Sequence, residues 1–489
     1  MLSFSELESQ FNGIPVHVVD DENISGFLHL NGSDTRAILS SSNPFKFRRG
    51  KNGWFDLDLR ASGGKRIVLH NAVSMKETEY RLGSTKDYQV NIFPNIVLIG
   101  QSVNLNQISA ISFGLHDFVK FFDYDYTENH SIDKADSEII AKIRESSEKR
   151  SSIRPLPAYD FFRPDQVYVV HRLPRILKFR LEKRHYEIGV RQSWGGTHRG
   201  NINFRTEPFA RISFAPNVTI DTALEYIWEW NQFFAQIACR PVALKSIFAE
   251  DENIHDSVPI NIYLSYLAQS TNRERNHRPN TGEIPFNHWR DRHILRDAMR
   301  GWLKNSNLRR LFRSALSRSI LESPQPSALD TLLRLCSGLE NLCELSGSEK
   351  IDSRTITRMA NAAAAVQHDD VGKVDVSRIK NLLSAINRPS LKHRLNILGE
   401  QISIVLPHEI TMPIISEAVR LRNLAAHGGS LTERELPMAH SVVEGLSSMC
   451  VIFDLLSSGL PLEDSEHRRL LAIGRVLGVA DELNALREK

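Results

Sequence analysis

The hydrophobic pattern of this chain changes once along its 489 residues, and that change limits the folds open to it. Up to about residue 220, short apolar runs alternate with turn-forming residues such as Asn31 and Gly32. Five of these runs predict β-strands, at 26–30, 54–59, 66–70, 88–93 and 96–100, with Pro94 separating the last two. Such spacing is typical of a β-rich sandwich or barrel-like domain.

Beyond about residue 286, the apolar residues recur at helical spacing, as Leu332, Leu335 and Leu339 do. The pattern predicts helices at 290–320, 327–346, 353–366, 376–387, 390–405, 410–427 and 432–458, followed by a short tail. We therefore expect an α+β multidomain protein. A β-rich N-terminal domain would cover residues 1–285, and an all-α helical bundle residues 286–489. The Pro-, Asn- and Arg-rich segment 269–283 would form the boundary.

One helix, at 222–237, is predicted inside the N-terminal domain and is rich in aromatic residues. Trp228, Trp230, Phe233 and Phe234 could stack on nucleic-acid bases. Packing in the core is the better-supported interpretation, because aromatic residues at helical spacing usually fill a protein interior.

The charge is balanced overall but uneven along the chain. Lys and Arg number 61 against 58 Asp and Glu, yet 273–318 holds 12 basic and 4 acidic residues, and 163–211 holds 11 and 4. Basic surfaces attract nucleic acid, whereas charge runs more often form solvated faces. Either stretch is therefore a candidate RNA contact, and the sequence does not choose between them.

Three Arg-x4-His pairs occur, Arg180/His185, Arg388/His393 and Arg422/His427, and chance alone accounts for one or two. The first lies in a mixed polar and apolar segment typical of a surface hairpin, and the second is interrupted by Pro389. The third differs, because it lies within a helical apolar pattern that ends at His427, before two glycines. After them, Thr432 and Glu435 form a predicted capping box.

The residues around the third pair suit metal-independent RNA cleavage. RNA supplies its own nucleophile, the 2′-OH, so a site needs a proton shuttle and a group that stabilises negative charge. His427 fits the proton shuttle and Arg422 the phosphate clamp, while Asn423 could fix the histidine tautomer and Arg420 add a weaker phosphate contact. The alternative is structural, since these side chains could instead cap the end of a helix.

Helical geometry constrains such a site. On an ideal helix, residues five apart lie about 140° apart around the axis and about 7.5 Å along it, so Arg422 and His427 would not share a face. Either the helix unwinds at His427, or two copies of the motif meet at a two-fold interface.

The element from Arg422 through Asn423 to His427, preceded by the helix at 332–342, resembles the HEPN superfamily of ribonucleases and nucleotide-binding helical domains. The N-terminal half, especially 26–30 and 94–100, is similar to the N-terminal domain of ApeA-type anti-phage proteins. The resemblance implies a dimerising helical bundle, RNA cleavage without a metal, and abortive-infection defence. It also implies a sensor or regulatory role for the N-terminal domain, which would restrain the nuclease until it is triggered. Its implied partners are RNA, with transfer RNA as one candidate, a phage-derived trigger and a second copy of the chain.

Two other functions stay open: a non-catalytic bundle that holds a nucleotide or a partner chain, and a ligand-binding β domain with a helical oligomerisation tail. No cofactor is expected, and four scattered cysteines without a CxxC pair argue against a metal site. The N-terminus lacks a signal-peptide pattern and no uninterrupted apolar run approaches membrane-spanning length, so a cytoplasmic location without membrane contact is expected.

Overall fold

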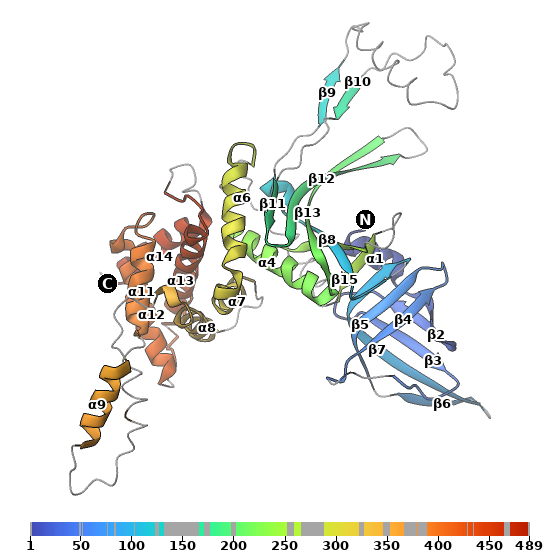
Figure 1. The fold of residues 1–489 in the computed structure, drawn as a ribbon, viewed down its shortest axis with the longest axis horizontal. Helices are drawn as coiled ribbons and strands as arrows, with labels where there is room; N and C mark the ends of the chain where they lie inside the picture. Colours follow the sequence, from blue (N-terminus) through green and yellow to red (C-terminus); the bar gives the residue numbers. More distant parts are fainter. Residues whose placement is uncertain are drawn as a thin grey trace.

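The protein is described here from a computed structural model. The described residues are 2–47, 50, 52–75, 77–82, 85–101, 103–122, 127–131, 166–170, 177–196, 202–251, 259–265, 288–321, 327–345, 353–365, 379, 389–427, 429–433, 435–463 and 470–487. The expected boundary segment 269–283, nearly all of the predicted helix 376–387, and Gly428 lie outside them. The expected α+β class is confirmed, with a β-rich N-terminal region followed by helices (Figure 1).

A closed barrel forms the N-terminal part of the β region. Its strands are β1 (Ile14–Val18), β2 (Asp21–His29), β3 (Arg36–Ser41), β4 (Phe55–Ala61), β5 (Arg66–Ser74) and β7 (Thr85–Gly100). They pair antiparallel in the order β1-β2-β3-β7-β5-β4, and β4 returns to β1. Of the two predicted architectures, a sandwich or a barrel-like domain, the structure shows the barrel.

The two strands predicted on either side of Pro94 are one strand, β7, so the predicted break is wrong. Proline lacks the N–H that a sheet ladder needs, and it is normally excluded from central strands. Here β3 pairs with β7 only up to Ile92, while β15 (Ile260–Leu264) begins pairing at Ile96. Pro94 thus lies in the interval between these two neighbours, which lets the strand run through.

An open antiparallel sheet continues from β7 in the order β15-β14-β8-β13-β12-β11. These strands are β8 (Ile108–Leu115), β11 (Leu177–Leu181), β12 (Arg184–Gly196), β13 (Ile202–Val218) and β14 (Leu244–Asp251). Helix α4 (Ile220–Ala238) covers one face, where the Trp230 ring lies 5.7 Å from that of Phe113 and 5.6 Å from that of Tyr186. Trp230, Phe233 and Phe234 are almost fully buried, so the core interpretation of these three aromatics is confirmed.

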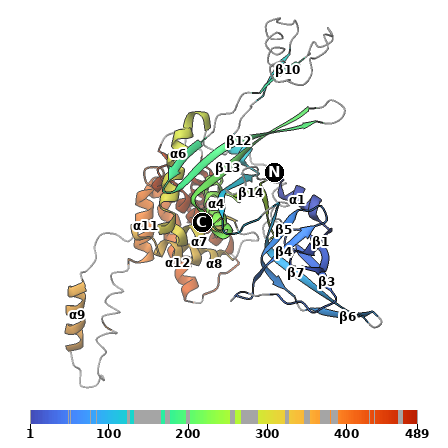
Figure 2. The ribbon, with the colours of Figure 1, turned by 45° about the vertical axis from the view of Figure 1, so that its right-hand side comes forward.

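The C-terminal helices pack into a bundle on the side of α4 away from the barrel (Figures 1 and 2). They are α6 (His288–Lys304), α7 (Ser306–Leu321), α8 (Ala328–Glu340), α11 (Leu391–Gln401), α12 (His408–Ala426), α13 (Glu435–Ser457) and α14 (Leu471–Arg487), with α9 (Ser353–Ala365) between α8 and α11. The single helix predicted at 290–320 is two helices that meet at Asn305. The predicted C-terminal tail is also wrong, because α14 is helical and buries Val476 and Leu483.

Among the described residues, α13 is the one helix long and apolar enough to cross a membrane by length and composition. Polar residues such as Glu444 and Asp454 interrupt its apolar sequence, so α13 contains no uninterrupted apolar run of that length. Most of its residues are buried against neighbouring helices. Packing in the bundle core accounts for its apolar character.

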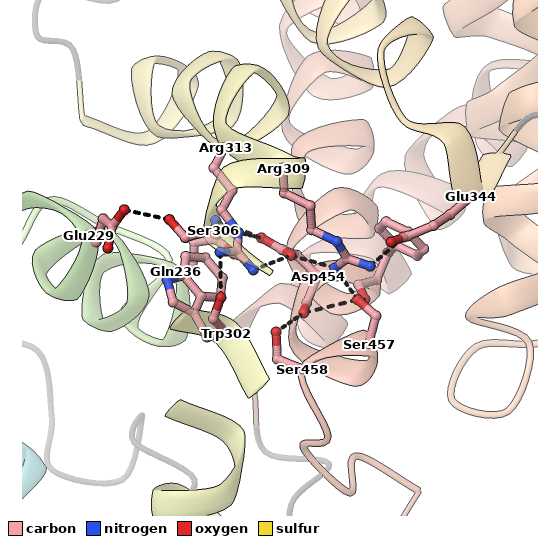
Figure 3. Close-up of polar contacts among 11 residues, drawn as sticks. Glu229, Gln236, Trp302, Ser306, Arg309, Arg313, Glu344, Asp454, Ser457 and Ser458 are labelled. Atoms are coloured by element: carbon pink, nitrogen blue, oxygen red, sulfur yellow. Dashed lines mark hydrogen bonds and ion pairs between the residues drawn. The ribbon is translucent and has the colours of Figure 1, made fainter. Parts of the chain in front are cut away.

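A buried charge network joins the N-terminal half to the bundle (Figure 3). Asp454 of α13 is fully buried and accepts hydrogen bonds from Arg309 Nη1 at 2.7 Å and from Arg313 Nε at 2.9 Å. On the α4 side, Gln236 Nε2 donates to Asp454 Oδ2 at 3.4 Å. Nearby, the Ser306 hydroxyl donates to Glu229 Oε1 at 2.6 Å. We call these six residues the Asp454 network.

Candidate active site

Helix α12 presents the Arg422 motif at its C-terminal end. Its apolar residues, including Ile414, Ala418 and Leu421, are buried in the bundle, which leaves the polar residues of the last turns near the surface. The helix ends at Ala426, and the backbone N–H of His427 donates to the Asn423 carbonyl at 3.1 Å. The predicted end of the helix at His427 is therefore confirmed.

Gly429 fixes the path of the chain after the helix. Its N–H donates to the Leu424 carbonyl at 2.9 Å. A Cβ at this position would lie 2.3 Å from Leu424 Cδ1, far inside contact distance, so a side chain here would require Leu424 to move. The glycine lets the chain turn tightly beside His427.

Arg422 is half-buried and points towards α8, where its Nη2 lies 3.3 Å from Glu340 Oε1. The two side chains are 34% and 43% exposed, and ion pairs this open to water contribute about 0–1 kcal/mol. A phosphate that displaces Glu340 from Arg422 therefore has to offset no more than this free energy. The sequence prediction gave Glu340 no role, because its contact with Arg422 joins residues 82 positions apart.

Arg420 is held by two carboxylates. Its Nε lies 2.7 Å from Glu417 Oε1, and its Nη1 lies 3.1 Å from Glu435 Oε1 on α13. Glu435 also accepts hydrogen bonds from the Thr432 backbone N–H and hydroxyl, so the glutamate half of the predicted capping box is present. The other half is not, because the Glu435 N–H donates to the Thr432 carbonyl and not to the hydroxyl. Hydrogen bonds from Thr432 and Arg420 hold the pKa of Glu435 below its usual value. Arg420 thus ties α12 to α13.

The side chains of His427 and Asn423 are exposed, and neither makes a hydrogen bond within the part of the chain that the structure describes. The backbone stays helical through Ala426, and His427 has φ −95° and ψ 12°. Its Cβ therefore leaves the axis as in a continuing helix, about 140° from that of Arg422. Ending the helix at His427 does not turn the imidazole back towards Arg422.

The other two Arg-x4-His pairs have different settings. Arg180 and His185 face each other in the β11–β12 hairpin, and both are exposed, as predicted. His393 lies in the first turn of α11, where the Ser390 hydroxyl accepts a hydrogen bond from its N–H at 3.2 Å. Arg388 lies outside the described residues.

The fold and the site together define a two-part protein, in which a barrel-and-sheet region is joined to a helical bundle with an exposed histidine at a helix end. The family model for ApeA N-terminal domain 1 matches residues 11–289, more than half of the chain. The chain therefore belongs to the ApeA family and is an anti-phage defence protein. The match ends at the start of α6, so it leaves most of the bundle unassigned. No curated protein and no solved structure matches the chain.

Proposed function

We propose that this protein is a metal-independent endoribonuclease of an abortive-infection system, with a HEPN-like bundle that is restrained by the N-terminal region until a phage-derived trigger binds. The observation that carries the proposal is the end of α12, where an exposed His427 and Asn423 follow Arg422, whose ion pair with Glu340 is weak and open to water. Family membership supplies the defence context.

In this mechanism, His427 accepts the proton of a ribose 2′-OH as the oxygen attacks the adjacent phosphorus. The bond from phosphorus to the 5′-oxygen breaks, and a protonated histidine returns a proton to that leaving oxygen. The products are a 2′,3′-cyclic phosphate and a 5′-hydroxyl. Arg422 stabilises the extra negative charge on the phosphoryl oxygens through charge-assisted hydrogen bonds, and Asn423 orients either the imidazole or the RNA.

The divergence of Arg422 and His427 within one chain favours a composite site made by two chains. A two-fold interface brings the same patch of each subunit together, so the α12 ends could face each other. We therefore expect an active homodimer formed through the bundle. Light scattering that shows a fully active monomer would refute this arrangement.

Helix α13 connects the N-terminal region to the candidate active site, and restraint of that site would act through this helix. This helix carries Asp454 near its C-terminal end, inside the Asp454 network, and Glu435 at its first residue, where it holds Arg420. A helix of 23 residues is about 34 Å long and moves largely as one body. A trigger that shifts α4 would therefore displace Gln236 from Asp454 and alter the position of α13 beside α12.

RNA cleavage by the purified full chain tests the proposal. Wild type, His427→Ala and His393→Ala are incubated in chelator with an extract of phage-infected cells, which supplies both RNA and the trigger, and the RNA ends that are absent from the extract alone are mapped. His393 is a matched control, because it is an exposed histidine of the same bundle that ends another Arg-x4-His pair. We expect cyclic-phosphate or 3′-phosphate ends from wild type and His393→Ala, and none from His427→Ala. Equal cleavage by all three proteins, or its loss on chelation, would contradict the mechanism.

Arg420 and Arg422 are both paired with carboxylates, and this favours one alternative function. In it, the bundle is not catalytic and binds a nucleotide or a partner chain. Glu340→Gln separates the two functions, because it frees Arg422 without touching His427. In a nuclease this variant lowers the KM for RNA and leaves kcat unchanged. In a binding module it changes affinity alone, and no new RNA ends appear with any variant.

A further inference from the structure

The face of the open sheet opposite α4 contains a cavity of about 300 Å³, between β12, β13, β8, β14 and the start of α1 (Phe4–Phe11). Gly114 of β8 lines the cavity. It pairs with Ser246, whose hydroxyl oxygen would lie 3.1 Å from an added Cβ, so a side chain at this position would narrow the cavity. Nearby on β12, Gly189 pairs with Phe209, and a Cβ there would come within 3.0 Å of the Phe209 ring that lines the cavity.

Arg191 lines this cavity between two aromatic rings. Its guanidinium carbon lies 5.6 Å from the ring centroid of Phe209 and 5.7 Å from that of Phe248. No residue within the described ranges hydrogen-bonds or ion-pairs with its side chain. Burial lowers the pKa of Arg191, because a desolvated cation costs free energy unless an anion compensates it.

The carboxylates around Arg191 already have other partners. Glu207 lies opposite Arg191 in the β12–β13 register, yet its Oε1 is 2.6 Å from Lys245 Nζ. Glu250 is paired with Arg211 at 2.5 Å. The carboxylate of Glu6 accepts hydrogen bonds from the backbone and hydroxyl of Ser3. Among the described residues, Arg191 therefore has no anion in direct contact, and Glu207 and Glu250 act on it only at longer range.

We propose that this cavity binds a small molecule through a carboxylate or phosphate group that pairs with Arg191. Cation–π stacking occupies the two faces of the guanidinium, whereas its N–H groups lie in the plane and stay available for two parallel hydrogen bonds to an oxyanion. The Ser246 hydroxyl and the Lys245 ammonium lie on the same wall and can contact the same group. The volume is at the lower end for ligand pockets, which suits a molecule no larger than a mononucleotide.

The cavity lies on the sheet face away from α4 and the bundle. Ligand binding to it can therefore be measured directly, without an assay of nuclease activity. Calorimetric titration of the full chain at constant ionic strength would use inorganic phosphate, AMP and glutarate as probes. The phosphate and carboxylate probes distinguish the two sources of oxyanion. Choline chloride serves as a cationic control that should not bind.

We expect at least one oxyanion probe to bind wild type at concentrations up to ~10 mM and to bind Arg191→Gln roughly tenfold to hundredfold more weakly. Arg180→Gln, an exposed arginine on neighbouring β11, should bind like wild type. Gly114→Ala, which keeps Arg191 and narrows the cavity, should also weaken binding, and it tests the site if Arg191→Gln fails to fold. Absence of binding by every oxyanion probe, or equal binding by wild type and both cavity variants, would overturn the proposal.

Discussion

Replacing Asp454 with asparagine should destabilise the junction between the two halves of the protein. Asp454 is fully buried and receives Arg309 at 2.7 Å and Arg313 at 2.9 and 3.0 Å. An asparagine has nearly the same shape but no charge, so two guanidinium groups that are each about 2% exposed would lose their shared counterion. The variant therefore removes the charge at position 454 and leaves the packing of the side chain nearly unchanged.

The expected loss of stability depends on the contacts that each arginine retains in the variant. Breaking a buried ion pair by removing one partner costs about 3–5 kcal/mol. Arg309 retains a hydrogen bond to Glu344, and Arg313 retains the Trp302 carbonyl at 2.9 Å together with the Trp302 ring. These contacts place the expected cost near the lower end, about 3 kcal/mol. With about 2–4 °C per kcal/mol for a domain of this size, the Tm of the bundle should fall by roughly 6–12 °C.

Differential scanning calorimetry of the full chain measures this loss. Asp297→Asn is the matched control, because it removes the same charge from an exposed pair with Arg296 and should cost about 0–1 kcal/mol. A triple variant, Arg309→Met, Arg313→Met and Asp454→Leu, should recover most of the stability, since apolar residues of similar volume can replace a buried ion pair. If Asp454→Asn melts within about 2 °C of wild type, the two arginines are solvated and the reasoning is wrong.

Three further outcomes are expected. Gly26→Ala should disrupt the barrel and lower its Tm sharply, because a Cβ would lie 1.9 Å from the Ile38 carbonyl oxygen, whereas Gly63→Ala, which meets nothing within 4 Å, should melt like wild type. Burial raises the pKa of Cys336 to about 12, so mass spectrometry should find this thiol unalkylated at neutral pH until the chain unfolds. Burial raises the pKa of Glu229 above 4.5, so its ionisation in the folded state costs stability as pH rises. Glu229→Gln should therefore melt above wild type at pH 7 and level with it at pH 4, and an equal difference at both pH values would contradict this account.

The features predicted well from sequence depend on near neighbours. The end of α12 and the pairing of Thr432 with Glu435 are set by residues within a few positions of each other. The break at Asn305 also has a local signal that the prediction missed, because the polar residues from Lys304 to Asn307 interrupt the apolar pattern and Asn and Ser favour helix ends. A Cβ at Gly301 would lie 2.3 Å from the Ser458 carbonyl oxygen, so close packing of α6 against the end of α13 accompanies the break. That contact joins distant parts of the chain.

The strand register of the barrel and the partners of the candidate site were beyond prediction for the same reason. The pattern indicates a strand on each side of Pro94, but the joining of the two into β7, and the register of β7 with β3, β5 and β15, are fixed by the completed fold. Likewise, Glu340 has nothing nearby in sequence to connect it with Arg422. By contrast, the predicted tail that forms α14 was an error of interpretation, since Val476, Val479 and Leu483 already show helical spacing.

The basic stretch 273–318 shows how charge counted along a sequence differs from charge available to a ligand. Arg309 and Arg313 belong to that stretch, yet both are buried and share Asp454 as a counterion, and Arg309 is also paired with Glu344. Counterion release requires a cation that can reach a phosphate, so these two add nothing to attraction for RNA. Arg310, between them in sequence, is 74% exposed and faces away from the network. In α7, Arg309 and Arg313 therefore hold the two halves of the protein together, whereas Arg310 faces solvent. Only an arginine that faces solvent can bind a nucleic acid.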